Sequence, residues 1–146
     1  MNNRNNDRPI LSIITPSYNS KRYVEETILS VLSQGVANIQ HIVYDGNSTD
    51  GTVEILEKYD HLEWESEEDS GQSEALNKCI TDVRGKYVGW INADDYYNPN
   101  AFLKALEILE CNRNIDLIYS NLDLVDEKSV VIGNRGGEPF DLTRFV

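Results

Sequence analysis

Short apolar, β-rich runs alternate with amphipathic helical stretches along this chain, and no other feature of the sequence limits the fold as much. Strands are expected at residues 10–16, 39–45, 62–67, 86–92 and 116–122. Helices are expected at residues 22–34, from the turn at 46–52 to about 59, around 75–83, and from 99 to 109. In the first helix, the apolar residues at helical spacing are Val24, Ile28, Val31 and Leu32.

Strands that are separated by helices pair in parallel, with the helices on both faces of the sheet. The alternation therefore predicts an α/β fold, a three-layer α/β/α domain with a mostly parallel sheet. After residue 122, a hairpin is expected around residues 127–129.

The length of 146 residues suits one domain with a sizeable core. We expect a disordered lead at residues 1–9, because "MNNRNNDRP" has no apolar stretch like that of a secretion signal, and a single domain at 10–146. No apolar run approaches the roughly 20 residues of a membrane helix, so we expect no transmembrane segment and a cytoplasmic location.

The charge balance is strongly acidic, with 25 acidic and 13 basic residues and a net charge of -12. Nucleic-acid binding is not expected, because it relies on Lys and Arg side chains that neutralise phosphates. A phosphate-bearing small molecule is compatible with this charge if a metal ion supplies the positive partner. Cys79 and Cys111 are too few and too far apart to indicate a metal or disulfide site, and Cys79 is expected to be a reduced core thiol.

Four loops that directly follow predicted strands are short, polar and mostly acidic. They are "PSYN" at residues 16–19, "DGNSTDGT" at 45–52, "EEDSGQSEALN" at 67–77 and "NADD" at 92–95. In sheets of this type, ligands bind outside the carboxyl ends of the strands. We therefore expect the four loops to meet at one edge of the sheet.

The first three loops offer side chains suited to a nucleotide. Tyr18 has an aromatic face, and the Asn19 amide can bond the edge of a heterocycle. Asp45 can accept hydrogen bonds from a base or ribose, or from the backbone of residues 47–50, and both can hold together. Gly71 allows a ligand close to the backbone. The chain lacks G-x-G-x-x-G and GK[ST], so a dinucleotide site of the usual type and a Walker loop are unsupported.

Asp94 and Asp95 are the candidate metal ligands. Hard divalent cations prefer carboxylate oxygen, and magnesium-like ions commonly combine one or two carboxylates with substrate phosphates. The competing interpretation is that "DDYYNP" only caps the helix that begins near Pro99. The other acidic loops and the scarcity of basic residues favour the metal.

At these four loops the sequence resembles the family 2 glycosyltransferases, which have the Rossmann-like, nucleotide-sugar-binding GT-A fold. The matching stretches are "SIITPSYN", "VYDGNSTDGT", "SGQSEALNKCI" and "WINADDYYNP", in family order, and the resemblance covers residues 10–122. It is greatest to members that build bacterial polysaccharides. It implies inverting transfer of a sugar from a nucleoside-diphosphate sugar, usually UDP-linked, to a saccharide or lipid-linked acceptor, with Mn²⁺ or Mg²⁺.

The resemblance also implies roles for individual residues. The nucleotide site would consist of Pro16, Ser17, Tyr18, Asn19, Asp45, Asp69, Gly71, Gln72, Asn92, Ala93 and Asp94. Asn92 stands where the Asp-x-Asp motif of the family begins with an acid. Because an amide is a neutral, weaker ligand, the metal would be bound by Asp94 and Asp95.

The general base of the family is usually a carboxylate well beyond the predicted strand at 116–122. It is therefore expected beyond Val146, in a longer catalytic domain of which this chain would be the donor-binding part, and the 146-residue chain would have weak activity or none. Glu138 and Asp141 can be nominated instead, but their spacing gives no support.

Two other functions stay open. One is a non-catalytic nucleotide-binding module or fragment. The other is a sugar nucleotidyltransferase, although "TPSYNSKRY" lacks the glycines of the loop that such enzymes use. An NAD-binding oxidoreductase is not expected without its glycine fingerprint. Peripheral association at the cytoplasmic face of a membrane also stays open.

Overall fold

The computed structural model describes residues 8–136. Most of the predicted lead, residues 1–7, and the nominated acids Glu138 and Asp141 lie outside the described residues. The chain divides after Lys104 into two compact units, and each is described by itself. The expectation of a single domain at residues 10–146 stays a prediction.

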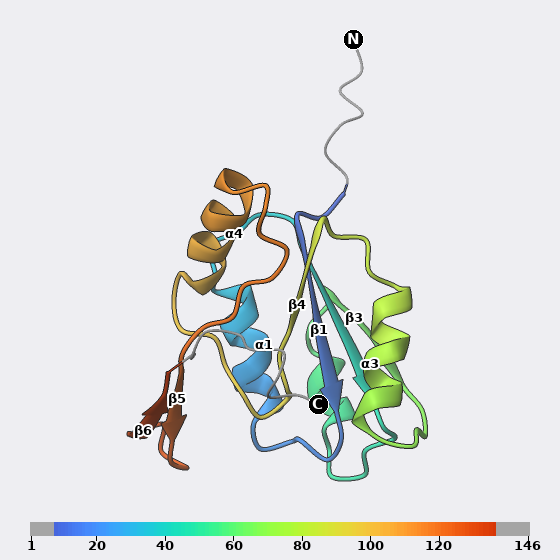
Figure 1. Cartoon of the computed structure of the whole chain (residues 1–146). Helices are drawn as coiled ribbons and strands as arrows, with labels where there is room; N and C mark the ends of the chain where they lie inside the picture. Colours follow the sequence, from blue (N-terminus) through green and yellow to red (C-terminus); the bar gives the residue numbers. More distant parts are fainter. Residues whose placement is uncertain (1–7, 137–146) are drawn as a thin grey trace, which may run out of the picture. The chain divides into compact units, whose positions relative to one another are not determined.

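The first unit is built on a four-stranded sheet in which all strands run parallel (Figure 1). The strands are β1 (Leu11–Ser17), β2 (Ile39–Asp45), β3 (Leu62–Ser66) and β4 (Tyr87–Trp90), in the spatial order β3-β2-β1-β4. The chain moves from β1 outward through β2 to β3 and then crosses to the opposite side of β1 for β4. The topological switch point, beside which such sheets bind ligands, therefore lies between β1 and β4.

Helices cover both faces of this sheet. α1 (Val24–Leu32) and the short α2 (Val53–Leu56) lie on one face, and α3 (Gln72–Thr81) lies on the other (Figure 1). The first turn of α4 (Ala101–Cys111) contributes to the core on the α1 face. The predicted α/β/α arrangement with a mostly parallel sheet is confirmed, although α2 ends earlier than the predicted residue 59.

Every residue of β1 is buried, because this strand lies inside the sheet and both of its faces are covered. Successive side chains of a strand point to opposite faces. Ile13 accordingly packs with Val31 of α1, and Ile14 packs with Cys79 of α3. Cys79 is a free, fully buried thiol, as predicted, and burial raises its pKa to about 11.

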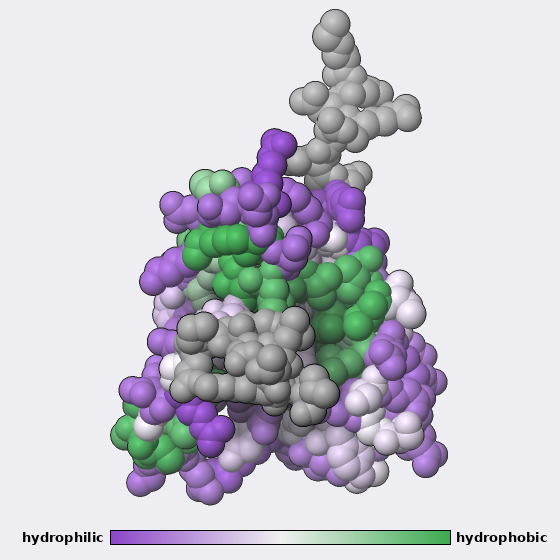
Figure 2. All heavy atoms as spheres, in the orientation of Figure 1, coloured by the Kyte–Doolittle hydropathy of each residue, from purple (hydrophilic) through white to green (hydrophobic). Residues whose placement is uncertain are grey.

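The edge strand β4 is less well covered. Val88 and Trp90 are 53% and 55% exposed, and they lie beside β1 residues that face α3. Ile80 of α3 is also 57% exposed. Figure 2 shows apolar atoms, in green, over the surface between β4 and α3.

The second unit contains an antiparallel hairpin of β5 (Leu122–Val125) and β6 (Val131–Arg135). The predicted hairpin is confirmed, and the Asp126 carboxylate accepts hydrogen bonds from the backbone N–H groups of Lys128 and Val130 in its turn. The predicted strand at 116–122 is wrong, since residues 116–121 form no strand. A β-prone run becomes a strand only where a neighbouring strand pairs with it, and in the described part of the chain the β5–β6 ladder begins at Leu122.

Within residues 8–136, no helix has both the length and the apolar character needed to cross a bilayer.

Candidate functional site

A hollow of about 690 Å³ lies at the carboxyl edge of the sheet. It is bounded by the end of β1, the loop after β2, the loop between β3 and α3, and the loop after β4. The lining residues are Pro16, Ser17, Tyr18, Asn19, Ser20, Tyr23, Gly46, Glu68, Asp69, Gly71, Gln72, Ala75, Asn92, Ala93 and Asp94. The structure therefore brings together residues from all four predicted loops. Asp45 and Asp95 are the two predicted site residues that do not line the hollow.

Asp45 is buried beneath the rim, with 1% of its surface exposed. Its carboxylate accepts hydrogen bonds from the Ser48 N–H (2.8 Å), the Ser48 hydroxyl (2.5 Å) and the Ser66 hydroxyl of β3 (2.7 Å). It therefore holds the turn after β2 against β3, which is one of the two roles predicted for it. Contact with a ligand stays a prediction.

The β1 end of the hollow presents Tyr18, whose side chain is 67% exposed. The neighbouring Asn19 has a left-handed backbone, with φ 47°, and its side-chain oxygen accepts a hydrogen bond from the Thr49 N–H (3.0 Å). The Asn19 N–H in turn donates to the Ser48 hydroxyl (2.7 Å). Asn19 thus joins the first two loops and leaves the Tyr18 ring at the surface.

Gly46 is a site residue that sequence reasoning missed. A Cβ atom at this position would lie 3.2 Å from Cδ2 of Tyr18 and 3.1 Å from Oδ2 of Asp69. Because Gly46 has no side chain, the Tyr18 ring and the Asp69 carboxylate can both lie close to its backbone in the hollow. The signal in the sequence was a glycine directly after the strand-ending Asp45.

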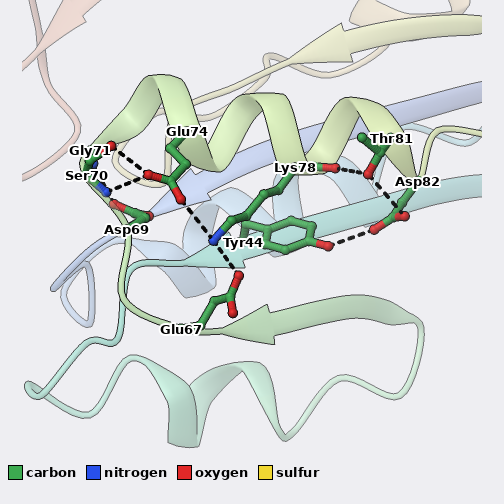
Figure 3. A network of polar contacts seen from close by, with 9 residues as sticks. All are labelled: Tyr44, Glu67, Asp69, Ser70, Gly71, Glu74, Lys78, Thr81 and Asp82. Atoms are coloured by element: carbon green, nitrogen blue, oxygen red, sulfur yellow. Dashed lines mark hydrogen bonds and ion pairs between the residues drawn. The ribbon is translucent and has the colours of Figure 1, made fainter.

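The loop between β3 and α3 is held by contacts along the exposed side of α3 (Figure 3). The Glu74 carboxylate accepts hydrogen bonds from the N–H (3.0 Å) and hydroxyl (2.6 Å) of Ser70, and these bonds lower the Glu74 pKa. The Gly71 N–H donates to Asp69 Oδ1 (2.7 Å). Lys78 lies between Glu74 and Glu67 and forms ion pairs with both. All of these partners are close together in sequence.

The loop after β4 is connected to α3 through an amide. Gln72 Nε2 donates to Asn92 Oδ1 (2.7 Å), and Asn92 Nδ2 donates to Asp95 Oδ2 (3.1 Å). A carboxylate at position 92 would lose the second donor and place like charges together. Asn92 is thus suited to orient Asp95, a role that its amide can perform and an acid cannot.

The donor set fits a hard cation only if a ligand completes it. None of the described residues that line the hollow is basic, and three of them, Glu68, Asp69 and Asp94, are acidic. Among residues 8–136, no group of three or more His, Cys, Asp or Glu side chains is placed to hold a metal ion. Asp94 and Asp95 offer two carboxylates, and magnesium-like ions take their remaining ligands from phosphates and water.

The sequence matches glycosyl transferase family 2 over residues 12–137. It is 38% identical over 109 residues to the putative teichuronic acid biosynthesis glycosyltransferase TuaG of Bacillus subtilis, which covers 71% of this chain and 43% of TuaG. S. aureus TarS 1-349 in complex with UDP-GlcNAc is similar in structure, with a TM-score of 0.65 and 27% identity over 70% of this chain and 32% of that chain. Mannosyltransferase PcManGT from Pyrobaculum calidifontis, in complex with GDP-Man and Mn2+, has a TM-score of 0.61 and 28% identity, over 70% of this chain and 32% of that chain.

The family match covers nearly all of the parallel sheet and the loops that surround the hollow, since residues 12–137 include all four loops. The chain spans less than half the length of each of the three relatives. On this evidence the chain belongs to glycosyl transferase family 2 and has its GT-A fold.

Proposed function

We propose that this chain is the donor-binding part of an inverting glycosyltransferase. The donor is a nucleoside-diphosphate sugar, with UDP as the expected nucleotide, and the acceptor is a saccharide or lipid-linked saccharide in polysaccharide biosynthesis. The observation that carries this proposal is the hollow at the switch point, which combines an exposed tyrosine ring with carboxylates and contains no basic lining residue among those described.

Two solved structures support the choice of donor, and one curated relative supports the choice of product. TarS has been solved with UDP-GlcNAc and PcManGT with GDP-Man and Mn2+, so similar folds hold nucleotide sugars. TuaG is named for teichuronic acid biosynthesis, which supports a polysaccharide product. The choice of UDP and the identity of the sugar are part of the proposal.

Each region of the hollow has a part in donor binding. The exposed ring of Tyr18 would offer a face to the base, and the Asp69–Gln72 segment, which also contributes to the lining of the hollow, would contact the nucleoside. Asp94 and Asp95 would hold Mn²⁺ or Mg²⁺. The ion, when bound, neutralises the diphosphate as the bond to the anomeric carbon breaks.

The transfer itself also needs a carboxylate that acts as a general base. A base on the face of the sugar opposite the diphosphate must take the proton of the acceptor hydroxyl. The acceptor oxygen then bonds the anomeric carbon as the nucleoside diphosphate leaves, and attack from the opposite face inverts the configuration. We assign this base to no residue of the chain. The 146-residue chain is therefore proposed to bind the donor and to transfer sugar weakly or not at all.

Calorimetric titration with UDP, in the presence and absence of Mn²⁺, tests the proposal. The chain should bind UDP more tightly with Mn²⁺, and the double variant Asp94→Ala/Asp95→Ala should lose that gain while keeping its melting temperature, because both residues are exposed loop positions. Absence of binding heat for the unaltered chain with UDP and Mn²⁺ would overturn the proposal.

A further inference from the structure

α1 and the turn that directly follows it carry a polar stripe that the family assignment does not explain. Thr27 and Ser30 lie three residues apart in α1, so they share one side of the helix, and Gln34 lies four residues later in the turn after α1. Thr27 and Gln34 are 0% and 1% exposed, and Ser30 is half-buried. Buried polar groups are costly unless they are hydrogen-bonded, so the partners of this stripe show what it does.

All three side chains bond to the backbone of the segment that follows β4. The Thr27 hydroxyl donates to the Asp95 carbonyl (2.7 Å), and the Ser30 hydroxyl accepts from the Tyr97 N–H (3.1 Å). Gln34 Nε2 donates to the Asn98 carbonyl (3.1 Å), and its Oε1 accepts from the Phe102 N–H (3.1 Å). α1 and the turn after it therefore hold this segment at four backbone positions.

Apolar packing fixes the other side of Asp94. Ala93 is 4% exposed and belongs to the core cluster that contains Val24 and Ile28 of α1. Asp94 is itself exposed, but both of its neighbours are held by α1: Ala93 packs against the helix, and the Asp95 carbonyl accepts a hydrogen bond from it. Its backbone has little freedom to move independently of the helix.

We propose that Thr27, Ser30 and Gln34 are positioning residues that set the affinity of the Asp94–Asp95 pair for a divalent ion. The inference rests on the proposed function, because it assumes that this pair binds the ion. The polar stripe holds the backbone on which both carboxylates are mounted, so that they meet the ion and the diphosphate together. Groups that orient metal ligands commonly change metal affinity by about 10–100-fold when they are removed.

Thr27→Val tests the inference, because valine has nearly the shape of threonine but no hydroxyl. The measured quantity is the gain in UDP affinity that Mn²⁺ produces in the 146-residue chain. Thr27→Val should reduce this gain about tenfold and leave UDP affinity without metal unchanged. Thr27→Ser, which keeps the hydroxyl, should restore the gain.

Thr15→Val is a matched control. Thr15 is also buried, at 1% exposure, but its hydroxyl contacts His41 (3.0 Å) and not the segment after β4. It should lower the melting temperature to a similar extent as Thr27→Val without changing the gain from Mn²⁺. If Thr27→Val does not fold, Ser30→Ala removes the contact with the Tyr97 N–H from a half-buried position and is expected to reduce the gain in the same way.

The outcomes separate this inference from the proposed function. A gain that is lost in Asp94→Ala but unchanged in Thr27→Val overturns the inference and leaves the proposed function standing. Equal losses in Thr27→Val and Thr15→Val also overturn it, since they indicate a general loss of stability. If the unaltered chain shows no gain from Mn²⁺, the metal site of the proposed function fails, and the inference fails with it.

Discussion

The two loops that bring acids to the hollow are held in opposite ways. The loop between β3 and α3 is kept in shape by exposed contacts between near neighbours in sequence, such as Ser70 with Glu74 (Figure 3). The segment after β4 is kept in shape by side chains of α1 and of the turn after it, which are 64–68 residues away and largely buried. One side of the hollow therefore depends on local chemistry and the other on tertiary structure.

This difference in how the two loops are held indicates which side of the site can adapt to a ligand. Exposed ion pairs and hydrogen bonds contribute little, because water competes for the same groups. Breaking a buried hydrogen bond leaves a polar group without a partner, which costs about 1–3 kcal/mol. We expect the Asp69–Gln72 segment to adjust around the nucleoside, while Asp94 keeps its position.

The largest effect should come from Gln34→Leu, which leaves the Phe102 N–H without its partner and removes one of the two donors to the Asn98 carbonyl, the other being the Ala101 N–H (3.3 Å). We expect the free energy of unfolding to fall by about 1–3 kcal/mol. Urea denaturation measures this. Gln72→Leu makes the same chemical change at an exposed position and should alter stability by less than about 0.5 kcal/mol. Similar losses for both variants would contradict the contrast between the two loops.

Gly46→Ala asks whether the β3–α3 loop can move. The new Cβ would approach Asp69 Oδ2 to 3.1 Å, so Asp69 must shift by a few tenths of an ångström. Because its loop is locally held, we expect UDP affinity, measured by calorimetry, to fall only about threefold, which is about 0.7 kcal/mol. A loss greater than about a hundredfold would show that this side of the hollow is as rigid as the other.

Acidification should loosen one loop before the other. Hydrogen bonds from Ser70 lower the pKa of Glu74 below its ordinary value of 4.5, so their contribution is present above pH 4.5 and is lost as the pH falls through the lowered value. The contacts of Thr27, Ser30 and Gln34 involve no titratable group. Amide hydrogen exchange, corrected for intrinsic rates, should therefore lose protection at the Ser70 N–H before the Phe102 N–H; loss in the reverse order would contradict this.

The smallest effect is expected for Lys78→Met, which removes the ion pairs with Glu67 and Glu74. These pairs are exposed and screened by salt, so the thermal unfolding midpoint should stay close to that of the unaltered chain. A drop comparable to that of Gln34→Leu would show that the exposed network stabilises the fold, and the comparison between the loops would then fail.

Much of the fold could be predicted because its signals are local. Alternating apolar runs and helical stripes indicated the parallel sheet, and the turn at Asp126–Val130 was recognisable from its own residues. The strand expected at residues 116–122 was wrong because pairing depends on a partner elsewhere in the chain. Leu32 shows the same limit: it has the spacing of a buried residue but is 56% exposed.

In the candidate site, too, the features with local signals could be predicted and those that depend on distant residues could not. Its acids, its tyrosine and its glycine-containing loop were found from the sequence, because strand ends and turn residues can be recognised without knowing what lies beside them. The inward position of Asp45, the Asn92 amide between Gln72 and Asp95, and the role of Gly46 could not be found in this way.

By itself, the sequence determined the order of the elements, the parallel sheet and the edge at which its acids gather, since periodicity and turn chemistry act over a few residues. Only the tertiary structure decided which acids line the hollow and what holds them there. The physical reason is the distance along the chain. The hydrogen bonds from α1 and the turn after it to the segment after β4 join residues 64–68 positions apart, and no local sequence pattern indicates such a pairing.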